Sequence, residues 1–189
     1  MKFDTTGIPE SIVNLWQTAD ETWEDNIDRP EFESYASADY AEVYLALKTL
    51  VGKANTFLEL GSGLGVVTMM AEKLGFDAHG IEAKEALVDI AEEYAQQYAP
   101  CSKFAVGSFI PDEFQWDPSA GHESVRTFVD VPSAYRELDM ELCDFDLIYA
   151  YPWPTEHDLY NNVIDQFARP GAKYLTYDAR EGISLREIE

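Results

Sequence analysis

The residues best suited to chemistry lie between Glu59 and Gly65, where an acid precedes three glycines that alternate with other residues. Apolar residues in 57–60 predict a buried strand before the glycines, and a helical pattern begins near Leu64. Glycine lets a ligand approach the main chain, and a helix N-terminus offers unpaired N–H groups. A carboxylate at this turn repels a pyrophosphate and attracts an ammonium group. The run therefore predicts a binding turn for a partly cationic ligand.

Glu82 is a second acid that the pattern places at the same site. It ends the short apolar segment 76–82, which predicts a strand, and a helical pattern follows it. Ligands of open parallel α/β sheets gather at the carboxyl ends of strands, so Glu82 is expected beside the glycine turn. A carboxylate there can accept hydrogen bonds from two hydroxyl groups of a ribose. The alternative is an exposed acid that caps the following helix.

The glycine spacing separates two classes of cofactor. The dinucleotide pattern G-x-G-x-x-G requires glycine at position 66, where this chain has Val66 and its third glycine comes one place earlier. The pattern E-x-G-x-G-x-G resembles motif I of the class I S-adenosylmethionine-dependent methyltransferases. The resemblance implies that Glu59 helps to hold the amino group of the cofactor and that Glu82 holds its ribose. A tight strand-to-helix turn without a ligand is the alternative.

Around these motifs, strand and helix patterns alternate, which indicates an α/β fold with a doubly wound, mostly parallel sheet. Strands are expected at about 55–60, 77–82, 103–106, 145–150 and 173–177, and helices after Leu64, before Pro100, over 133–142 and from about 155. The resemblance covers roughly residues 53–178 and implies the strand order 3-2-1-4-5. About a dozen residues follow strand five, so the closing strands 6 and 7 are expected to be reduced or absent.

Length and composition predict a single domain over 1–189, with a helical segment in 1–52 and the cofactor-binding α/β core in 53–189. The aromatic residues Trp16, Trp23 and Tyr44 lie on apolar helical stripes and are expected to pack in the core. Residues 110–132 carry prolines and a glycine and predict a long loop, for which a lid over the site is a candidate role.

Two further turns complete the predicted site. Gly107, Ser108 and Phe109 follow the third strand, where many members of the resembled family have an aspartate that accepts the adenine amino group. Ser108 is a weaker substitute for that aspartate, and Phe109 either flanks the ring or belongs to the core. The fourth strand ends at Ala150 and continues into 151–154, Tyr-Pro-Trp-Pro. Methyltransferases that modify amino groups carry an acid or amide before such a turn, and this chain lacks it, so a proline-stiffened structural turn is an equal alternative.

The predicted site residues fall into three groups. Cofactor binding is assigned to Glu59, Gly61, Ser62, Gly63, Gly65, Glu82, Ala83, Gly107, Ser108, Phe109 and Ala150. A substrate wall is assigned to Tyr151, Pro152 and Trp153. No catalytic residue is identified, although Tyr151 and His157 are candidates, and Glu156 is expected only to begin a helix. No metal site is expected, because an aligned nucleophile can accept a methyl group without one.

Composition excludes several classes of protein. With 36 acidic and 13 basic residues and a net charge of −23, the chain lacks the basic stripe that nucleic-acid binding requires. A solvated acidic surface explains this charge most simply, and the same field would steer a cationic substrate or protein partner. The chain lacks a long apolar run and an apolar N-terminal leader, so it is expected in the cytoplasm, away from membranes. Cys101 and Cys143 form no paired motif and are expected to be buried.

These patterns together predict S-adenosylmethionine-dependent methyl transfer to a small-molecule or protein acceptor. The alternative is a non-catalytic S-adenosylmethionine-binding partner or sensor protein. A nicotinamide oxidoreductase is disfavoured by the glycine spacing and by the lack of a second domain. The acceptor, the atom that is methylated and the oligomeric state are not predicted.

Overall fold

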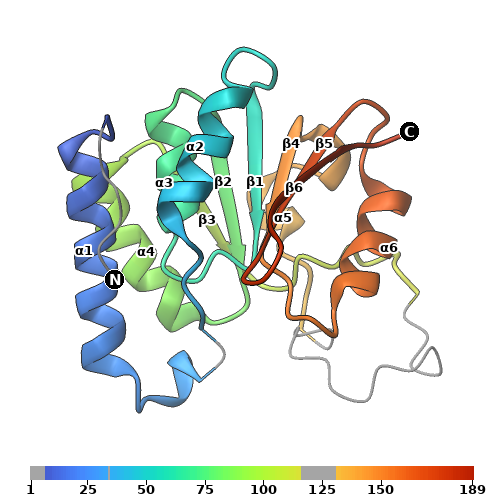
Figure 1. Cartoon of the computed structure of the whole chain (residues 1–189). Coiled ribbons are helices and arrows are strands. Elements are labelled where there is room, and N and C mark those ends of the chain that lie inside the picture. The colour runs from blue at the N-terminus through green and yellow to red at the C-terminus, as the bar shows by residue number, and fades with distance from the viewer. Residues whose placement is uncertain (1–6, 34, 116–130) are drawn as a thin grey trace.

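The structure, a computed structural model, describes residues 7–33, 35–115 and 131–189. Its centre is a six-stranded sheet in the order β3-β2-β1-β4-β5-β6 (Figure 1). The strands are β1 (Thr56–Leu60), β2 (Asp77–Glu82), β3 (Lys103–Val106), β4 (Leu147–Ala150), β5 (Lys173–Asp178) and β6 (Gly182–Glu187). The first five strands are parallel, and β6 pairs antiparallel with β5 along its whole length. The predicted fold class and strand order are confirmed.

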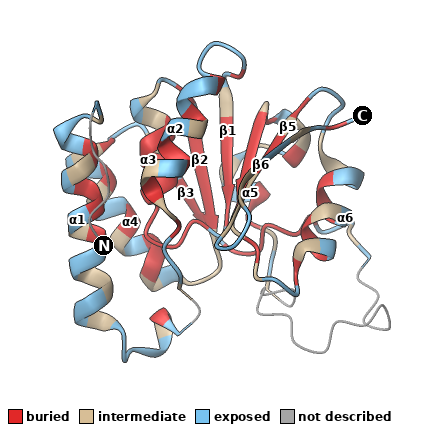
Figure 2. Cartoon of the chain, in the orientation of Figure 1, coloured by how far each residue is buried: buried red, intermediate tan, exposed pale blue. Residues whose placement is uncertain are grey.

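Helices cover both faces of this sheet. The helices α3 (Val66–Lys73) and α4 (Glu85–Tyr98) lie on one face together with α2 (Tyr40–Leu50), which contacts α3 and β6, and α1 (Glu10–Asn26) packs against α3 and α4. The short helix α5 (Tyr135–Leu138) and α6 (His157–Phe167) belong to the core of the other face, together with the 3₁₀ turn η3 (Leu142–Asp144). The strands β1, β2 and β4 between these layers are almost entirely buried (Figure 2), as expected for a parallel sheet covered on both sides, whereas the edge strand β6 is partly exposed.

The N-terminal helices pack as the apolar stripes predict. Trp16 and Tyr44 are buried in the core and Trp23 is partly buried against it. After α1 the chain turns through the 3₁₀ segment η1 (Pro30–Phe32), and Lys84 Nζ donates a hydrogen bond to the carbonyl oxygen of Glu31 at 2.8 Å. This contact ties the segment before α2 to the start of α4, close to the carboxyl ends of the strands.

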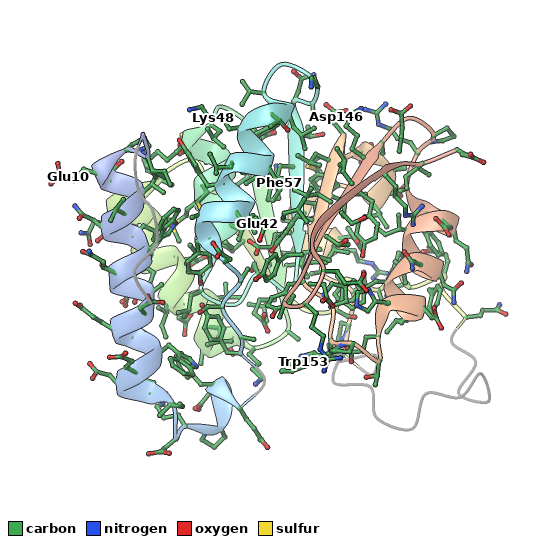
Figure 3. All side chains as sticks on the ribbon, in the orientation of Figure 1. Glu10, Glu42, Lys48, Phe57, Asp146 and Trp153 are labelled. Atoms are coloured by element: carbon green, nitrogen blue, oxygen red, sulfur yellow. The ribbon has the colours of Figure 1, made fainter. Side chains whose placement is uncertain are left out.

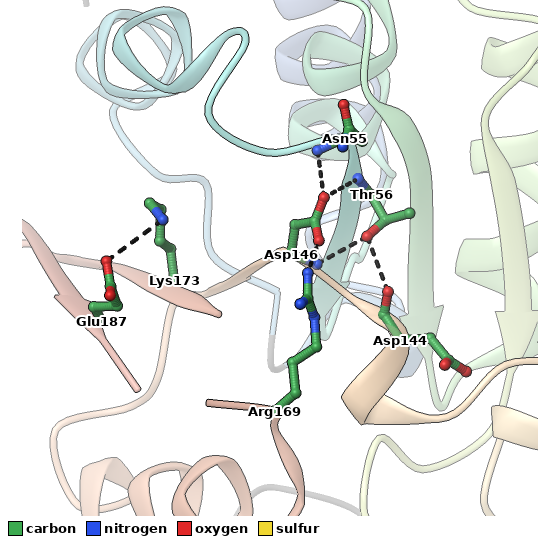
Figure 4. Close-up of polar contacts among 7 residues, drawn as sticks. All are labelled: Asn55, Thr56, Asp144, Asp146, Arg169, Lys173 and Glu187. Carbon is green, nitrogen blue, oxygen red and sulfur yellow. Dashed lines mark hydrogen bonds and ion pairs between the residues drawn. The ribbon is translucent and has the colours of Figure 1, made fainter. Parts of the chain in front are cut away.

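A polar cluster holds the opposite, amino edge of the sheet (Figure 4). Asp146 accepts hydrogen bonds from the N–H groups of Asn55 at 2.6 Å and Thr56 at 3.3 Å, and it forms an ion pair with Arg169. The Thr56 hydroxyl donates to the carbonyl oxygen of Asp144 at 3.1 Å. Burial acts to raise the pKa of Asp146, but these N–H groups and the Arg169 guanidinium outweigh it and lower the pKa below its ordinary value. The cluster fixes the starts of β1 and β4 relative to one another.

Several boundaries differ from the sequence predictions. The helix expected over 133–142 is limited to α5 and the separate turn η3, because Asp139 adopts a left-handed conformation that ends α5. The closing strands are reduced, as expected: among the described residues, β6 follows β5 at the sheet edge and no seventh strand is present. The expected burial of the cysteines is wrong, since Cys101 is exposed and Cys143 is partly exposed. Most of the predicted loop 110–132 lies outside the described residues. No helix within the described ranges is long and apolar enough to cross a membrane.

Candidate functional site

A cavity of about 700 Å³ opens along the carboxyl ends of the parallel strands. Its wall comes from the segments after β1, β2, β3, β4 and β5, and from residues 35–40, which precede and begin α2. The carboxyl ends of β1 and β2 are the arrowheads at the lower edge of the sheet in Figure 1. Figure 3 places Trp153 at this edge and Asp146 at the opposite one. The cavity therefore lies where ligands of open α/β sheets bind.

The glycine turn after β1 forms the floor of the cavity. Gly61 has a φ of +76°, which favours glycine, and a Cβ atom added there would come no closer than 4.0 Å to the Tyr160 hydroxyl oxygen. Gly63 faces the ring of Tyr35, which an added Cβ would approach within 2.7 Å. Gly65 does not line the cavity, because it packs beneath Phe104 at the start of α3. Gly61 is thus the glycine of this turn with free space above its backbone.

Glu59 is buried beneath this turn and still lines the cavity, with 5% of its surface exposed. Its Oε2 atom accepts hydrogen bonds from the Thr68 N–H at 2.8 Å and the Thr68 hydroxyl at 2.6 Å. Burial raises the pKa of Glu59 to about 8, although both bonds from Thr68 act to lower it. Because Thr68 is in the first turn of α3, the carboxyl group occupies an N–H that a helix N-terminus would otherwise present to an anion.

Glu82, at the end of β2, binds the backbone of two neighbouring loops that line the cavity. Its Oε2 accepts a hydrogen bond from the Gly63 N–H and its Oε1 accepts one from the Lys84 N–H, each at 3.0 Å. Burial raises the pKa of Glu82, and these N–H groups partly offset the rise. Each carboxylate oxygen has two acceptor positions, so the group can also accept two ligand hydroxyls. The alternative of an exposed capping acid does not fit, because Glu82 lines the cavity and spans two loops.

Three tyrosines that the sequence interpretation did not select surround Glu59. Tyr35 and Tyr40 come from the segment before and at the start of α2, and their hydroxyl oxygens are hydrogen-bonded at 2.9 Å. Tyr149 lies opposite Glu59 in the β1–β4 register, is 1% exposed, and has a hydroxyl without a hydrogen-bond partner among the described residues. Burial raises the pKa of all three phenols, and the charge of Glu59 adds to the rise.

The turn after β3 contributes a second side of the cavity. Ser108 lines it, but its Oγ accepts a hydrogen bond from the Ile110 N–H at 3.1 Å, so this oxygen also shapes the loop. Phe109 is buried and its ring centroid lies 4.6 Å from that of Tyr160. Phe109 therefore belongs to a core cluster and also lines the cavity, while its place beside an adenine ring stays a prediction.

The segment after β4 forms the remaining wall. Tyr151, Pro152 and Trp153, which were assigned to a substrate wall, line the cavity, and Trp153 belongs to neither apolar cluster of the described residues. Glu156 was expected only to begin a helix, yet it is 1% exposed and lines the cavity next to the first turn of α6. His157 Nε2 lies 3.7 Å from Asp178 Oδ2, which brings the ends of β4 and β5 together.

The predicted residues therefore converge, with two exceptions. Gly65 and Ala150 lie behind the wall, and Ala150 is fully buried in the core shared with α6. The turn of residues 178–181 between β5 and β6 also lines the cavity. The sequence patterns did not predict this, because the turn lies far from the glycine motif in sequence and carries no motif of its own. Among the described residues, no group of three or more His, Cys, Asp or Glu side chains is placed to hold a metal ion.

Comparison with known proteins places this arrangement in a known fold. No protein-family model matches the sequence, and no curated protein matches it. An RNA methyltransferase from Salinibacter ruber, solved with S-adenosyl-L-homocysteine, aligns over 76% of this chain and 78% of its own at 17% identity, with a TM-score of 0.54. An O-methyltransferase from Bacillus cereus, also solved with S-adenosylhomocysteine, aligns over 90% and 67% at 14% identity, with a TM-score of 0.55.

A third similar structure is the O-methyltransferase TomG from Streptomyces achromogenes, involved in tomaymycin synthesis and solved with S-adenosylmethionine. It aligns over 91% of this chain and 68% of its own at 16% identity, with a TM-score of 0.54. At these identities the likeness shows that the fold is shared.

Proposed function

We propose that this chain, which has the fold of the class I methyltransferases, transfers a methyl group from S-adenosylmethionine to an acceptor bound in the same cavity. One observation carries the proposal: the buried carboxyl of Glu59 accepts the hydrogen bonds of Thr68 in the first turn of α3. A pyrophosphate would lose this N–H donor and meet a carboxyl group instead, whereas an ammonium group would be attracted. The site therefore favours S-adenosylmethionine over a dinucleotide.

The residues at the cavity fit this cofactor. Glu59 would hold its ammonium group and Glu82 the two ribose hydroxyls, while Phe109 would lie against the adenine. Gly61 leaves space for the ligand at the backbone. The Ser62 hydroxyl is buried in the wall without a hydrogen-bond partner among the described residues, so it is available to a polar group of the ligand. A cavity of about 700 Å³ is within the usual range for a small-molecule site.

When bound, S-adenosylmethionine supplies a methyl group on a sulfonium, which an acceptor atom attacks as the carbon–sulfur bond breaks to leave a neutral thioether. The contribution of this chain is to align the acceptor and to exclude water. Pro152 and the ring of Trp153 form a stiff wall for that purpose at the end of β4. His157, which lies beside Asp178 at the rim, could take up a proton that the acceptor loses.

The acceptor is proposed to be a small molecule or a protein. One structural neighbour is an RNA methyltransferase, but this chain has 36 acidic residues against 13 basic ones, which opposes binding of a polyanion. A non-catalytic binder of S-adenosylmethionine would use the same cofactor contacts and would differ in showing no turnover.

Calorimetry with S-adenosylhomocysteine and with NAD tests the cofactor assignment. We expect S-adenosylhomocysteine to bind and to raise the melting temperature, since a ligand at a hundredfold excess over its Kd stabilises the folded state by about 2.7 kcal/mol. NAD should produce no shift. Binding of NAD alone would contradict the proposal, and binding of S-adenosylhomocysteine without methyl transfer to any acceptor would favour the non-catalytic alternative.

A further inference from the structure

The cavity has two halves that differ in what surrounds them. The cofactor half lies at the ends of β1, β2 and β3 and contains the glycine turn, Glu82 and Phe109. The acceptor half lies at the ends of β4 and β5. We define it by Tyr149, Tyr151, Trp153, Glu156 and the turn of residues 178–181. The order of strands in the sheet makes the two halves adjacent, because β1 and β4 are neighbours.

The acceptor half combines negative charge with aromatic surface. Glu156, Asp178 and Glu181 contribute three carboxyl groups, against the single guanidinium group of Arg180 in the turn of residues 178–181. Hydrogen bonds from the N–H groups of Arg180 and Glu181 lower the pKa of Asp178, which keeps this carboxylate ionised. The rings of Tyr151 and Tyr177 meet edge to face with centroids 4.9 Å apart, which fixes one of the aromatic walls.

The acceptor half also contains a buried hydroxyl group, that of Tyr149. Tyr149 is 1% exposed, lines the cavity and has no hydrogen-bond partner among the described residues. A buried hydroxyl without a partner costs stability, so a ligand that pairs with it gains affinity. Because the phenol keeps its proton, its oxygen can accept a hydrogen bond from an N–H group while the aromatic faces contact the rest of the ligand.

From this arrangement we propose that the methyl acceptor carries a positively charged amine, bound in the acceptor half between the aromatic rings, the carboxylates and the Tyr149 hydroxyl. This inference rests on the proposed function and names the substrate class of the same site. Carboxylates attract an ammonium group, and aromatic faces attract it through their quadrupole. Acceptors with a carboxylate or phosphate at that position would be repelled. The groups that recognise the amine lie in the cavity wall and are separate from the acidic outer surface.

The test uses three ligands that share a phenol ring and differ in charge: tyramine, which is cationic, tyrosol, which is neutral, and 4-hydroxyphenylacetate, which is anionic. Binding is measured by calorimetry on the protein saturated with S-adenosylhomocysteine. We expect tyramine to bind at least 10-fold more tightly than tyrosol, and 4-hydroxyphenylacetate to bind most weakly. The preference for tyramine should shrink as salt is added, because the charges are partly open to solvent.

Three variants test which residues cause the preference for tyramine. Tyr149→Phe removes a hydroxyl that has no partner in the described structure, so it should keep the fold and lower the affinity for tyramine. Glu181→Gln, at an exposed position of the turn, and Glu156→Gln should do the same, while Glu92→Gln on the exposed side of α4 is the matched control. If Glu156→Gln fails to fold, the other two variants still decide the result.

The outcomes separate this inference from the proposed function. Failure of S-adenosylhomocysteine to bind, measured first on the same samples, contradicts the proposed function. Binding of S-adenosylhomocysteine with equal affinity for the three phenols, with preference for the anion, or with no binding of any phenol contradicts the inference alone. A tyramine preference that survives in both Tyr149→Phe and Glu181→Gln also contradicts it, because the amine would then be recognised elsewhere.

Discussion

Replacing Glu59 by glutamine should remove the pH dependence of stability that this buried carboxyl group causes. The ordinary pKa of a glutamic acid is 4.5, and burial raises the pKa of Glu59 to about 8 in the folded chain. Below about pH 4.5 both the folded and the unfolded chain hold the proton. As pH rises from there to about 8, the unfolded chain loses the proton first, so the free energy of unfolding falls by about 1.4 kcal/mol for each pH unit.

Glutamine cannot ionise, so the Glu59→Gln variant escapes this loss. Its carbonyl oxygen can still accept the hydrogen bonds from the N–H and hydroxyl of Thr68, as Oε2 of Glu59 does. We expect the two proteins to be similarly stable at pH 5, and the variant to be more stable by roughly 3–5 kcal/mol at pH 9. Urea denaturation at pH 5, 7 and 9 measures this difference, with Glu92→Gln on exposed α4 surface as the control.

The Glu59→Gln substitution should weaken ligand binding, although it stabilises the unliganded chain at high pH. At pH 7 the unliganded Glu59 is protonated, so an ammonium group that binds there must displace that proton. Wild type should release about one proton on binding S-adenosylhomocysteine, which calorimetry in two buffers of different ionisation enthalpy detects. The variant should release none and bind more weakly. A stability difference that stays constant from pH 5 to 9 would refute the placement of Glu59 in a low-dielectric site.

Three further predictions concern single residues at the two edges of the sheet. Glu82→Gln should raise the Kd for S-adenosylhomocysteine about 10- to 100-fold in calorimetry, since a hydrogen bond to a charged group contributes about 1.5–3 kcal/mol, and an unchanged Kd would remove Glu82 from the site. Trp153→Ala should lower methyl transfer about 100-fold with little change in cofactor Kd. If Trp153 instead has a structural role and packs against neighbouring side chains, the variant should lose about 3–5 kcal/mol of stability and keep its specific activity. Asp146→Asn should cost about 1.5–3 kcal/mol at pH 7 in urea denaturation. The cost should begin to shrink as pH falls below 3.8 and be lost as pH falls through the lowered pKa of the folded chain, because Asp146 stabilises the fold only while its carboxyl is ionised. Its cofactor Kd should be unchanged, and a weaker Kd would show that the two edges are coupled.

The fold could be predicted from sequence because local and global patterns agree. The apolar segments 55–60 and 77–82, each followed by a helical stripe, match β1 with α3 and β2 with α4 to within one or two residues. The predicted helix boundaries are wrong where the apolar pattern in the sequence is weak. The expected helix over 133–142 contains apolar residues at helical intervals, but the left-handed conformation of Asp139 divides it, and no local signal marks that conformation at an aspartate.

The site could be predicted in part for a physical reason. Motif residues at the ends of β1, β2 and β4 converge because parallel strands bring their carboxyl ends to one edge. Tyr149 was missed because it lies inside a buried strand, where an aromatic residue usually means core packing. Tyr149 lines the cavity because the pairing of β4 with β1 places it opposite Glu59. This pairing joins segments far apart in sequence, so local sequence patterns do not reveal it.

The two edges of the sheet differ in how their polar groups are satisfied, and this difference indicates where ligand binding acts. At the amino edge, the Asp146 carboxylate accepts backbone hydrogen bonds and an arginine, and its pKa is lowered. At the carboxyl edge, burial raises the pKa of Glu59 and Glu82, and the hydroxyls of Ser62 and Tyr149 have no hydrogen-bond partner among the described residues. The first arrangement stabilises the chain by itself, whereas the second costs stability until a ligand completes it. A ligand that supplies a cation to the carboxylates and polar atoms to the hydroxyls therefore removes the cost of burying these groups without partners. The folded chain should be stabilised most by the ligand whose charge and hydrogen-bonding groups match this edge.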